Sequence, residues 1–433
     1  MDQSFSGAFA DRSRDSGGAF PALSKEGQGG YFRDPLMHME WLNQRRLTIY
    51  PRIIVAMYII LGGALIVAPA FWGPGGTDLY NRPLGADFSH YWVASSLALA
   101  GQAAMVYDPS KFIAAEEAKF KVKFPIPWLY PPTFLFIVLP LALLPYVPAL
   151  IAWLAITLSG YLAVLRRIAP HPAAIWLALA FPGTFQNFFH GQNGFLSAAL
   201  IGGGLLLVDN FPLAGGFLLG LASYKPQLAV LIPLALIAGK RWKALISLLA
   251  AVSVLVLSSL VLFGKDLWLL FFNNLSLPMK LLKTGALPVN KMVTFFSALL
   301  QFGGGLYLAL FIQVCVMILV ALAIFLVWHQ NRPLSSRASV LVIGILLFTP
   351  YLFAYDLALL VLPLAWLGWE GYTQGWMPGE QVLLFLGWTM PFITPVLALI
   401  HLQIAPLILV AIMIMAVKRR MTGTSLPSEA ANP

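Results

Sequence analysis

The chain has 433 residues, of which 59% are hydrophobic and only 10% are charged, whereas soluble globular domains carry about 25% charged residues. This composition excludes a soluble enzyme, and the long unbroken apolar runs exclude an outer-membrane barrel, whose strands alternate in polarity. The net charge of +10 is carried in short clusters between the apolar runs. It therefore indicates membrane topology and not binding to nucleic acid.

The two ends of the chain are polar. Residues 1–44 are rich in Gly and Ser and predict a disordered cytoplasmic tail, with no evident cleavable signal peptide. The first apolar run, 53–72, follows Arg45, Arg46 and Arg52, as in a signal anchor whose N-terminus stays inside. A short cytoplasmic tail is expected at 421–433, which leaves 45–420 as the transmembrane domain.

The apolar runs between breakers predict about twelve crossings. They lie at 53–72, 133–165, 172–187, 194–209, 212–223, 226–238, 244–263, 306–328, 338–350, 354–368, 381–398 and 400–417. The run 133–165 could hold two short spans, but splitting it would place every later basic cluster outside. We therefore expect one broken or tilted crossing there, and an all-α polytopic protein with both termini in the cytoplasm.

The cytoplasmic loops are then the basic ones. They contain Arg166 and Arg167, Lys240 with Arg241 and Lys243, Arg332 with Arg337, and Lys418 with Arg419 and Arg420. Two long loops, 73–132 and 264–305, fall on the opposite side. In the first, the stretch 87–107 has apolar residues at helical spacing and predicts an amphipathic helix along the membrane surface. In the second, lysines alternate with Leu and Phe, which suits contact with anionic lipid head groups, although a solvated loop is the alternative.

Asp87 is the leading catalytic candidate. It lies in G-A-D-F-S-H-Y-W at the start of the amphipathic helix, where a carboxylate could simply cap the helix. However, His90 and Tyr91 follow one helical turn later, so three polar groups gather beside the membrane.

Three further polar segments are candidates. Asp356 in T-P-Y-L-F-A-Y-D is either a functional group or half of a buried ion pair, and Lys225 in S-Y-K-P-Q either meets a lipid phosphate or snorkels to the interface. The third segment, F-Q-N-F-F-H-G-Q-N-G-F, is rich in amides, which suit sugar hydroxyls as well as backbone capping. Its polar members are Gln186, Asn187, His190, Gln192 and Asn193.

No metal or other cofactor is predicted. His90 and His190 lack neighbours at metal-ligand spacing, and the single cysteine, Cys315, lies in an apolar run. The G-x-x-x-G at Gly216–Gly220 suggests close helix packing.

In order along the chain, D-F-S-H-Y-W, P-W-L-Y-P-P, F-F-H-G-Q-N-G, S-Y-K-P-Q and T-P-Y-L-F-A-Y-D resemble the motifs of glycosyltransferase family 87. The resemblance covers roughly residues 50–370. This family belongs to the type C superfamily of polytopic transferases and includes polyprenyl-phosphate-mannose-dependent mannosyltransferases that build phosphatidylinositol mannosides. The resemblance implies a type C glycosyltransferase fold.

The resemblance also assigns roles. Members of the family carry an Asp in the first outer loop as general base, and Asp87 matches it by its place in the motif. The family's YPP, GQN and KPQ segments match 130–132, 191–193 and 225–227. The mannosyltransferase branch has a His-containing segment in a late outer loop, where this chain reads T-P-Y-L-F-A-Y-D. This departure leaves the sugar unspecified and weakens the match of Asp356.

The chemistry fits these residues. A lipid monophosphate is a good leaving group, so one base that deprotonates the acceptor hydroxyl suffices for an inverting single displacement. Lys225 is our first choice for the cation that stabilises the departing phosphate, and Arg82 the second. The expected substrate-binding residues are His90, Tyr91, Arg82, Tyr130, His190, Gln192, Asn193, Lys225, Gln227 and Asp356.

The sequence thus predicts a multi-pass glycosyltransferase of the bacterial inner membrane with its active site on the periplasmic or extracellular side. Its partners would be a polyprenyl-phosphate-linked hexose or pentose, a lipid or glycan acceptor, and membrane lipids. The alternative is a transporter or flippase of a lipid-linked substrate, which would place its charges at the bilayer midplane on repeated broken helices. Here the charges cluster at the outer interface, which favours the enzyme.

Overall fold

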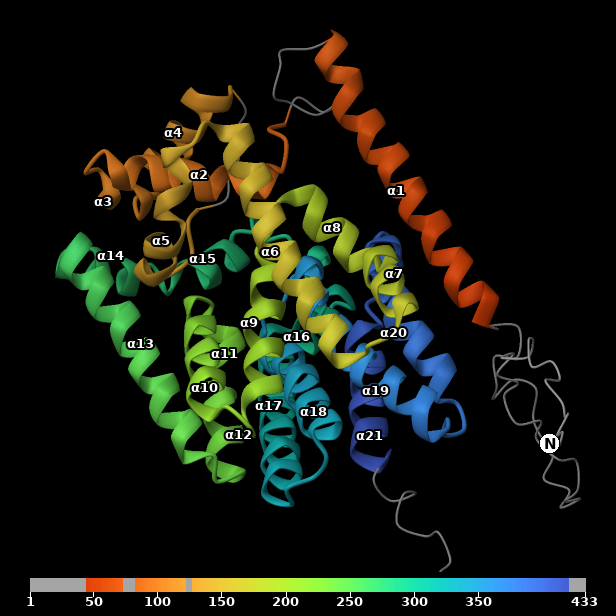
Figure 1. Cartoon of the computed structure of the whole chain (residues 1–433). Coiled ribbons are helices and arrows are strands. Elements are labelled where there is room, and N and C mark those ends of the chain that lie inside the picture. The colour runs from red at the N-terminus through yellow and green to blue at the C-terminus, as the bar shows by residue number, and fades with distance from the viewer. Residues whose placement is uncertain (1–43, 73–81, 122–126, 420–433) are drawn as a thin grey trace, which may run out of the picture. The chain divides into compact units, whose positions relative to one another are not determined.

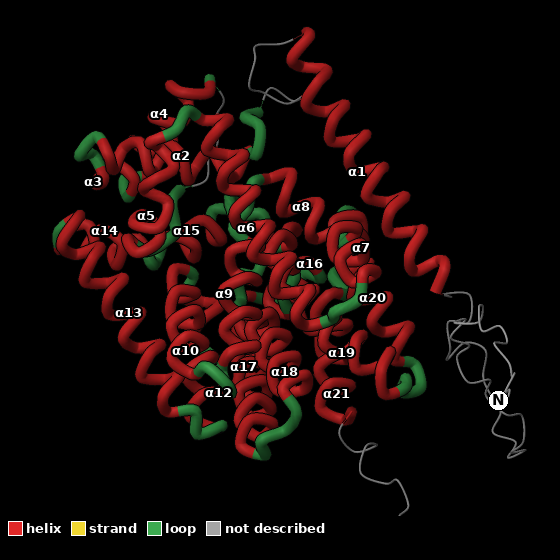
Figure 2. Tube along the Cα trace, in the orientation of Figure 1, coloured by secondary structure: helices red, strands yellow, loops and turns green. Residues whose placement is uncertain are grey.

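The structure, a computed structural model, describes residues 44–72, 82–121 and 127–419. Throughout these ranges the regular elements are helices (Figure 2), and an isolated bridge pairs Met292 with Phe353. The predicted tails, 1–44 and 421–433, lie outside the described residues except for Gln44, which begins the first helix. The all-helical prediction is confirmed for the part of the chain that is described.

Among the described residues, five helices are long and apolar enough to cross a membrane. They are α1 (Gln44–Trp72), in its segment Arg45–Ala64, α6 (Tyr146–Ile168), α13 (Trp242–Phe263), α17 (Leu306–His329) and α20 (Glu380–Ala398). Six further apolar stretches have 10–17 residues, fewer than the roughly 20 that a full crossing needs. The count of twelve crossings therefore stays a prediction.

The shorter elements complete the chain (Figure 1). They are α2 (Ala86–Leu99), α3 (Ala103–Val106), α4 (Pro109–Phe120), α5 (Pro132–Val138), η1 (Leu139–Leu143), α7 (Pro172–Ala180), α8 (Pro182–His190), α9 (Gly194–Leu207), α10 (Pro212–Leu221), η2 (Ala222–Tyr224), α11 (Pro226–Ala229), α12 (Ile232–Ala238), α14 (Lys265–Asn274), α15 (Leu277–Lys283), η3 (Val289–Lys291), α16 (Phe295–Gln301), α18 (Leu334–Phe348), η4 (Ala354–Leu360), α19 (Val361–Gln374) and α21 (Ala405–Lys418).

The apolar run 133–165 is divided at Pro145, whose extended backbone separates η1 from α6. The first part, α5 and η1, packs against α2, and only α6 has the length of a membrane span. Proline cannot continue the preceding helix because it lacks an amide hydrogen. The single crossing that the distribution of basic residues favours in this region stays a prediction.

The two predicted long loops contain helices. A helix, α2, forms in the stretch expected to be amphipathic, but it ends at Leu99, because Gly101 at φ +73 turns the chain. Its amphipathic character stays a prediction. Half of its 14 residues are buried, and its place on the membrane surface stays a prediction. The segment 264–305 forms α14, α15, η3 and α16, and Asn274 Nδ2 donates to the carbonyl of Tyr107 at 2.6 Å, which ties the two segments together.

Glycines bring the central helices into backbone contact. A Cβ on Gly216 would lie 2.1 Å from the carbonyl oxygen of Ala244, and one on Gly220 would lie 2.6 Å from that of Leu248. The G-x-x-x-G of α10 therefore allows α13 to approach closely, and the expected packing role is confirmed.

The helices place two sets of loops at opposite ends. α9 runs from Gly194 to Leu207, about 20 Å at 1.5 Å per residue, so Asn193 and Asp209 lie at its two ends. We call the end with residues 190–193, 222–227 and 349–356 the site end. The other is the basic end, where Asp209 pairs with Arg241 at 2.7 Å and with the buried Arg337.

Candidate active site

Two glycines join the start of α2 to the loop after α8. Gly85, at φ +65, precedes α2, and Gly191, at φ +66, follows α8. A Cβ on Gly191 would lie 2.6 Å from Cβ of Phe88 and 3.5 Å from Cα of Gly85. Glycine is needed at both positions because other residues rarely adopt positive φ. Their contact brings the first turn of α2 against the loop that carries Gln192.

Asp87 occupies the first turn of α2 and faces this loop. Gln192 Nε2 donates to Asp87 Oδ2 at 2.7 Å, and His190 Nδ1 lies 3.8 Å from the same oxygen. The N-cap residue is Gly85, and no side chain caps the helix, so the simple capping role is wrong. The Asp87 side chain is 26% exposed and that of His190 is 41% exposed, so the carboxylate is accessible.

Tyrosines continue the network inward. Tyr91 donates its hydroxyl to Gln192 Oε1 at 2.8 Å, and its oxygen lies 3.3 Å from the Tyr130 hydroxyl. Asn193 Nδ2 then donates to the Tyr130 hydroxyl at 2.9 Å. The two amides that follow Gly191 therefore hold both tyrosine hydroxyls, one each.

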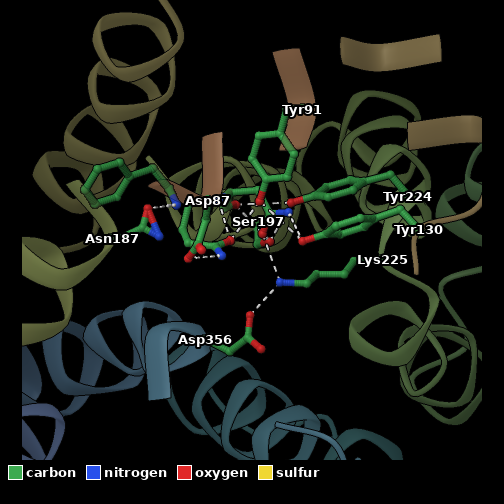
Figure 3. A network of polar contacts seen from close by, with 11 residues as sticks. Asp87, Tyr91, Tyr130, Asn187, Ser197, Tyr224, Lys225 and Asp356 are labelled. Carbon is green, nitrogen blue, oxygen red and sulfur yellow. Dashed lines mark hydrogen bonds and ion pairs between the residues drawn. The ribbon is translucent and has the colours of Figure 1, made fainter. Parts of the chain in front are cut away.

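Lys225 and Asp356 close the network at its buried end (Figure 3). Lys225 Nζ donates to Asn193 Oδ1 at 2.9 Å and to Asp356 Oδ1 at 2.5 Å. Their side chains are only 3% and 4% exposed. An ammonium carries three N–H donors, and these two bonds use two of them, which leaves one for a further oxygen. We call this set of linked side chains the polar network. Its members are Asp87, Tyr91, Tyr130, His190, Gln192, Asn193, Lys225 and Asp356.

Residues that the sequence did not single out support this end. The Tyr224 hydroxyl donates to the Asn193 carbonyl at 3.1 Å and lies 2.7 Å from Ser197 Oγ, while Lys225 Nζ lies 5.4 Å from the centre of the Tyr355 ring. Tyr224 and Tyr355 each precede a predicted residue by one position. Their place in the motifs S-Y-K-P-Q and A-Y-D was the sequence signal that could have identified them as site residues.

His90 points to a different partner from the one expected. Its Nδ1 lies 2.6 Å from Oε1 of Glu116, a fully buried residue of α4. Burial lowers the pKa of His90, but the hydrogen bond and charge of Glu116 and the charge of Asp87 outweigh it and raise the pKa above its ordinary value. The pKa of Glu116 is also raised, because burial disfavours the charged carboxylate. The sequence did not indicate Glu116 as the partner of His90, and a role of His90 beside Asp87 and Tyr91 stays a prediction.

Of the predicted site residues, the polar network brings together Asp87, Tyr91, Tyr130, His190, Gln192, Asn193, Lys225 and Asp356. Arg82 is half-buried before α2, and Gln227 is exposed on α11. Gln186 donates to the carbonyl of Pro391 at 2.7 Å instead. In the described ranges, no three His, Cys, Asp or Glu side chains gather as metal ligands.

Comparison with known families gives one match. The family model of glycosyltransferase family 87 matches residues 128–350, which is more than half of the chain. This range includes Tyr130, the segment 190–193 and Lys225, whereas Asp87 and Asp356 lie outside it. No curated protein and no solved structure matches the chain.

Proposed function

The chain belongs to glycosyltransferase family 87, and we propose that this membrane glycosyltransferase transfers a hexose or pentose from a polyprenyl phosphate to a lipid or glycan acceptor. The observation that carries the proposal is the polar network, which links one accessible carboxylate, Asp87, to one buried cation, Lys225. The first suits a base that meets an acceptor hydroxyl, and the second suits a phosphate held away from water.

The reaction is a single displacement. Asp87 takes the proton from the acceptor hydroxyl as its oxygen forms a bond to the anomeric carbon. The bond from that carbon to the phosphate oxygen breaks, and the phosphate leaves with the electron pair. Configuration at the anomeric carbon inverts, and the proton on Asp87 passes to water.

Lys225 would stabilise the charge that develops on the departing phosphate. In the structure its positive charge is balanced by Asp356 at 2.5 Å. A buried charge without a partner is costly, so Asp356 holds the cation in place before the donor arrives. Its free N–H would then bind a phosphate oxygen.

The distribution of charge supports an extracytoplasmic site. The polar network lies at the site end, while Arg241 and Arg337 lie at the basic end. Basic residues remain on the cytoplasmic side of membrane proteins. The site end would therefore face the periplasm or the exterior, with both termini on the cytoplasmic side of the bacterial inner membrane. The donor would be lipid-linked, not a nucleotide sugar.

The test is a donor panel. Purified protein is incubated with native lipid extract and either polyprenyl-phosphate sugars or the matching nucleotide sugars, and products are identified by mass spectrometry. We expect transfer from at least one polyprenyl-phosphate sugar. Transfer from nucleotide sugars alone would refute the donor class, and donor binding without any transfer would favour the transporter.

A further inference from the structure

A cavity of about 570 Å³ opens at the site end and shares no residue with the polar network. It lies among the end of α15, η3, the end of α16 and the first residue of α17, Leu306. Its polar lining residues are Lys283, Asn290, Gln301 and His401, and the remaining walls are mainly Leu, Val and Pro.

The charged side chain that lines this cavity is Lys283, and the described lining contains no Asp or Glu. Around it, the segment 264–305 has four lysines and a single acidic residue, Asp266. Such a surface attracts an anion, and a mixed apolar and cationic lining suits an anion that carries an apolar body.

The cavity adjoins the exposed apolar start of α17. α17 is one of the five helices long enough to span a membrane, and it begins at Leu306 in the cavity wall. The side chains that follow are open: Tyr307 is 87% exposed and Phe311 is 64% exposed. A ligand with its head group in the cavity could lay its hydrocarbon chains along this face.

Hydrogen bonds within the protein hold the cavity walls in place. Gln301 Nε2 donates to the Val289 carbonyl at 3.2 Å, and Gln403 Nε2 donates to the Met292 carbonyl at 2.9 Å. Val293 N also donates to the Leu352 carbonyl at 2.9 Å. The cavity is therefore preformed, and its wall is hydrogen-bonded to the segment that leads to Asp356.

We propose that this cavity binds the phosphate head group of an anionic glycerophospholipid. Lys283 pairs with the phosphate, His401 adds a second donor at the opening, and the acyl chains lie along the exposed start of α17. This lipid site is separate from Lys225 and does not depend on the proposed transfer reaction.

The test measures binding of short-chain lipids to the purified full-length protein in detergent. Dihexanoyl phosphatidylglycerol is compared with dihexanoyl phosphatidylcholine and with inorganic phosphate, by shift of the melting temperature and by titration. The variant is Lys283→Ala, and the matched control is Lys265→Ala, an exposed lysine of the same segment that does not line the cavity.

We expect phosphatidylglycerol to bind wild type and Lys265→Ala equally well and Lys283→Ala about tenfold more weakly, the loss of one charge-assisted hydrogen bond. Equal binding of phosphatidylcholine, equal binding of inorganic phosphate, or equal weakening in both variants would each overturn the proposal. The first would show no preference for an anion, the second no need for a lipid, and the third only diffuse attraction.

Discussion

Gln192 donates a hydrogen bond of 2.7 Å to the Asp87 carboxylate and accepts one of 2.8 Å from the Tyr91 hydroxyl. One side-chain amide thus orients the proposed base and connects it to the buried tyrosines. Since Gln192 is 105 residues from Asp87 in the chain, this orientation depends on the packing of α8 against α2.

Replacement of Gln192 by Leu should impair transfer more than binding. The carboxylate loses the donor that orients it, and misplacement of a catalytic group by about 1 Å can cost about 100-fold in rate. We expect kcat to fall at least tenfold with little change in KM for the donor, measured by steady-state transfer. Gln186→Leu is the control, because Gln186 lies on α8 and bonds to Pro391, outside the polar network. Equal losses in the two variants would contradict an orienting role.

Asp356→Asn should destabilise the protein. Lys225 would then be a buried charge without its counter-charge, and breaking a buried pair costs about 3–5 kcal/mol. The double variant Lys225→Met with Asp356→Leu should recover much of the lost stability, because it removes both charges, but should not transfer sugar. Thermal unfolding in detergent checks the first statement and a transfer assay the second. An Asp356→Asn protein as stable as wild type would show that the pair does not hold the lysine.

Gly191→Ala should separate α8 from α2. The new Cβ would lie 2.6 Å from Cβ of Phe88, at a backbone φ of +66. Gly303→Ala is the matched control, since its φ is +80 but nothing lies within 4 Å of the new Cβ. Both variants incur the backbone cost of about 1–2 kcal/mol, and we expect a further loss of stability and most of the activity to disappear only in Gly191→Ala. Indistinguishable variants would mean that the contact is unimportant.

Glu116→Gln should lower the pKa of His90, because it removes the charge that outweighs burial. In wild type the pKa values of both His90 and Glu116 are raised. A raised folded-state pKa gives stability that is present below the unfolded-state value and is lost as pH rises through the folded-state value. The stability advantage of wild type over the variant should therefore shrink as pH rises above about 6.5, the ordinary pKa of histidine, and through the raised folded-state pKa of His90. A constant or growing advantage across a series of melting curves would contradict this coupling.

The proposed topology is tested by cysteine labelling in intact cells. In a Cys315→Ser background, Thr284→Cys places an exposed thiol at the site end and Asn210→Cys places one at the basic end. A membrane-impermeant maleimide should label the first in intact cells and the second only after the membrane is opened. The reverse pattern would put the active site in the cytoplasm.

The sequence predicted individual site residues better than their contacts. In so apolar a chain Asp87, Lys225 and Asp356 were conspicuous because polar groups near a membrane are costly. Their connection through Gln192, Tyr91, Tyr130 and Asn193 could not be read, because it joins four helical regions far apart in the chain. For the same reason Glu116, the partner of His90, was missed, since nothing in the sequence places α4 against α2.

The fold was also predictable only in part. The helical class and the position of α2 followed from hydropathy and spacing, because both are local properties. The break at Pro145 and the helices within 264–305 were harder to predict. Short amphipathic helices are stabilised by packing on their neighbours and not by propensity alone, so a single sequence reads them as loops.

The most direct test of the central claim is the rate of sugar transfer by Asp87→Asn, with the donor found active for wild type. Asparagine keeps the size and one acceptor oxygen for Gln192 but cannot take the proton. With matched melting curves and donor affinity, we predict a rate lower by about 100-fold to 10,000-fold, the range for loss of a general base. If Asp87→Asn transfers sugar at the wild-type rate, Asp87 is not the base.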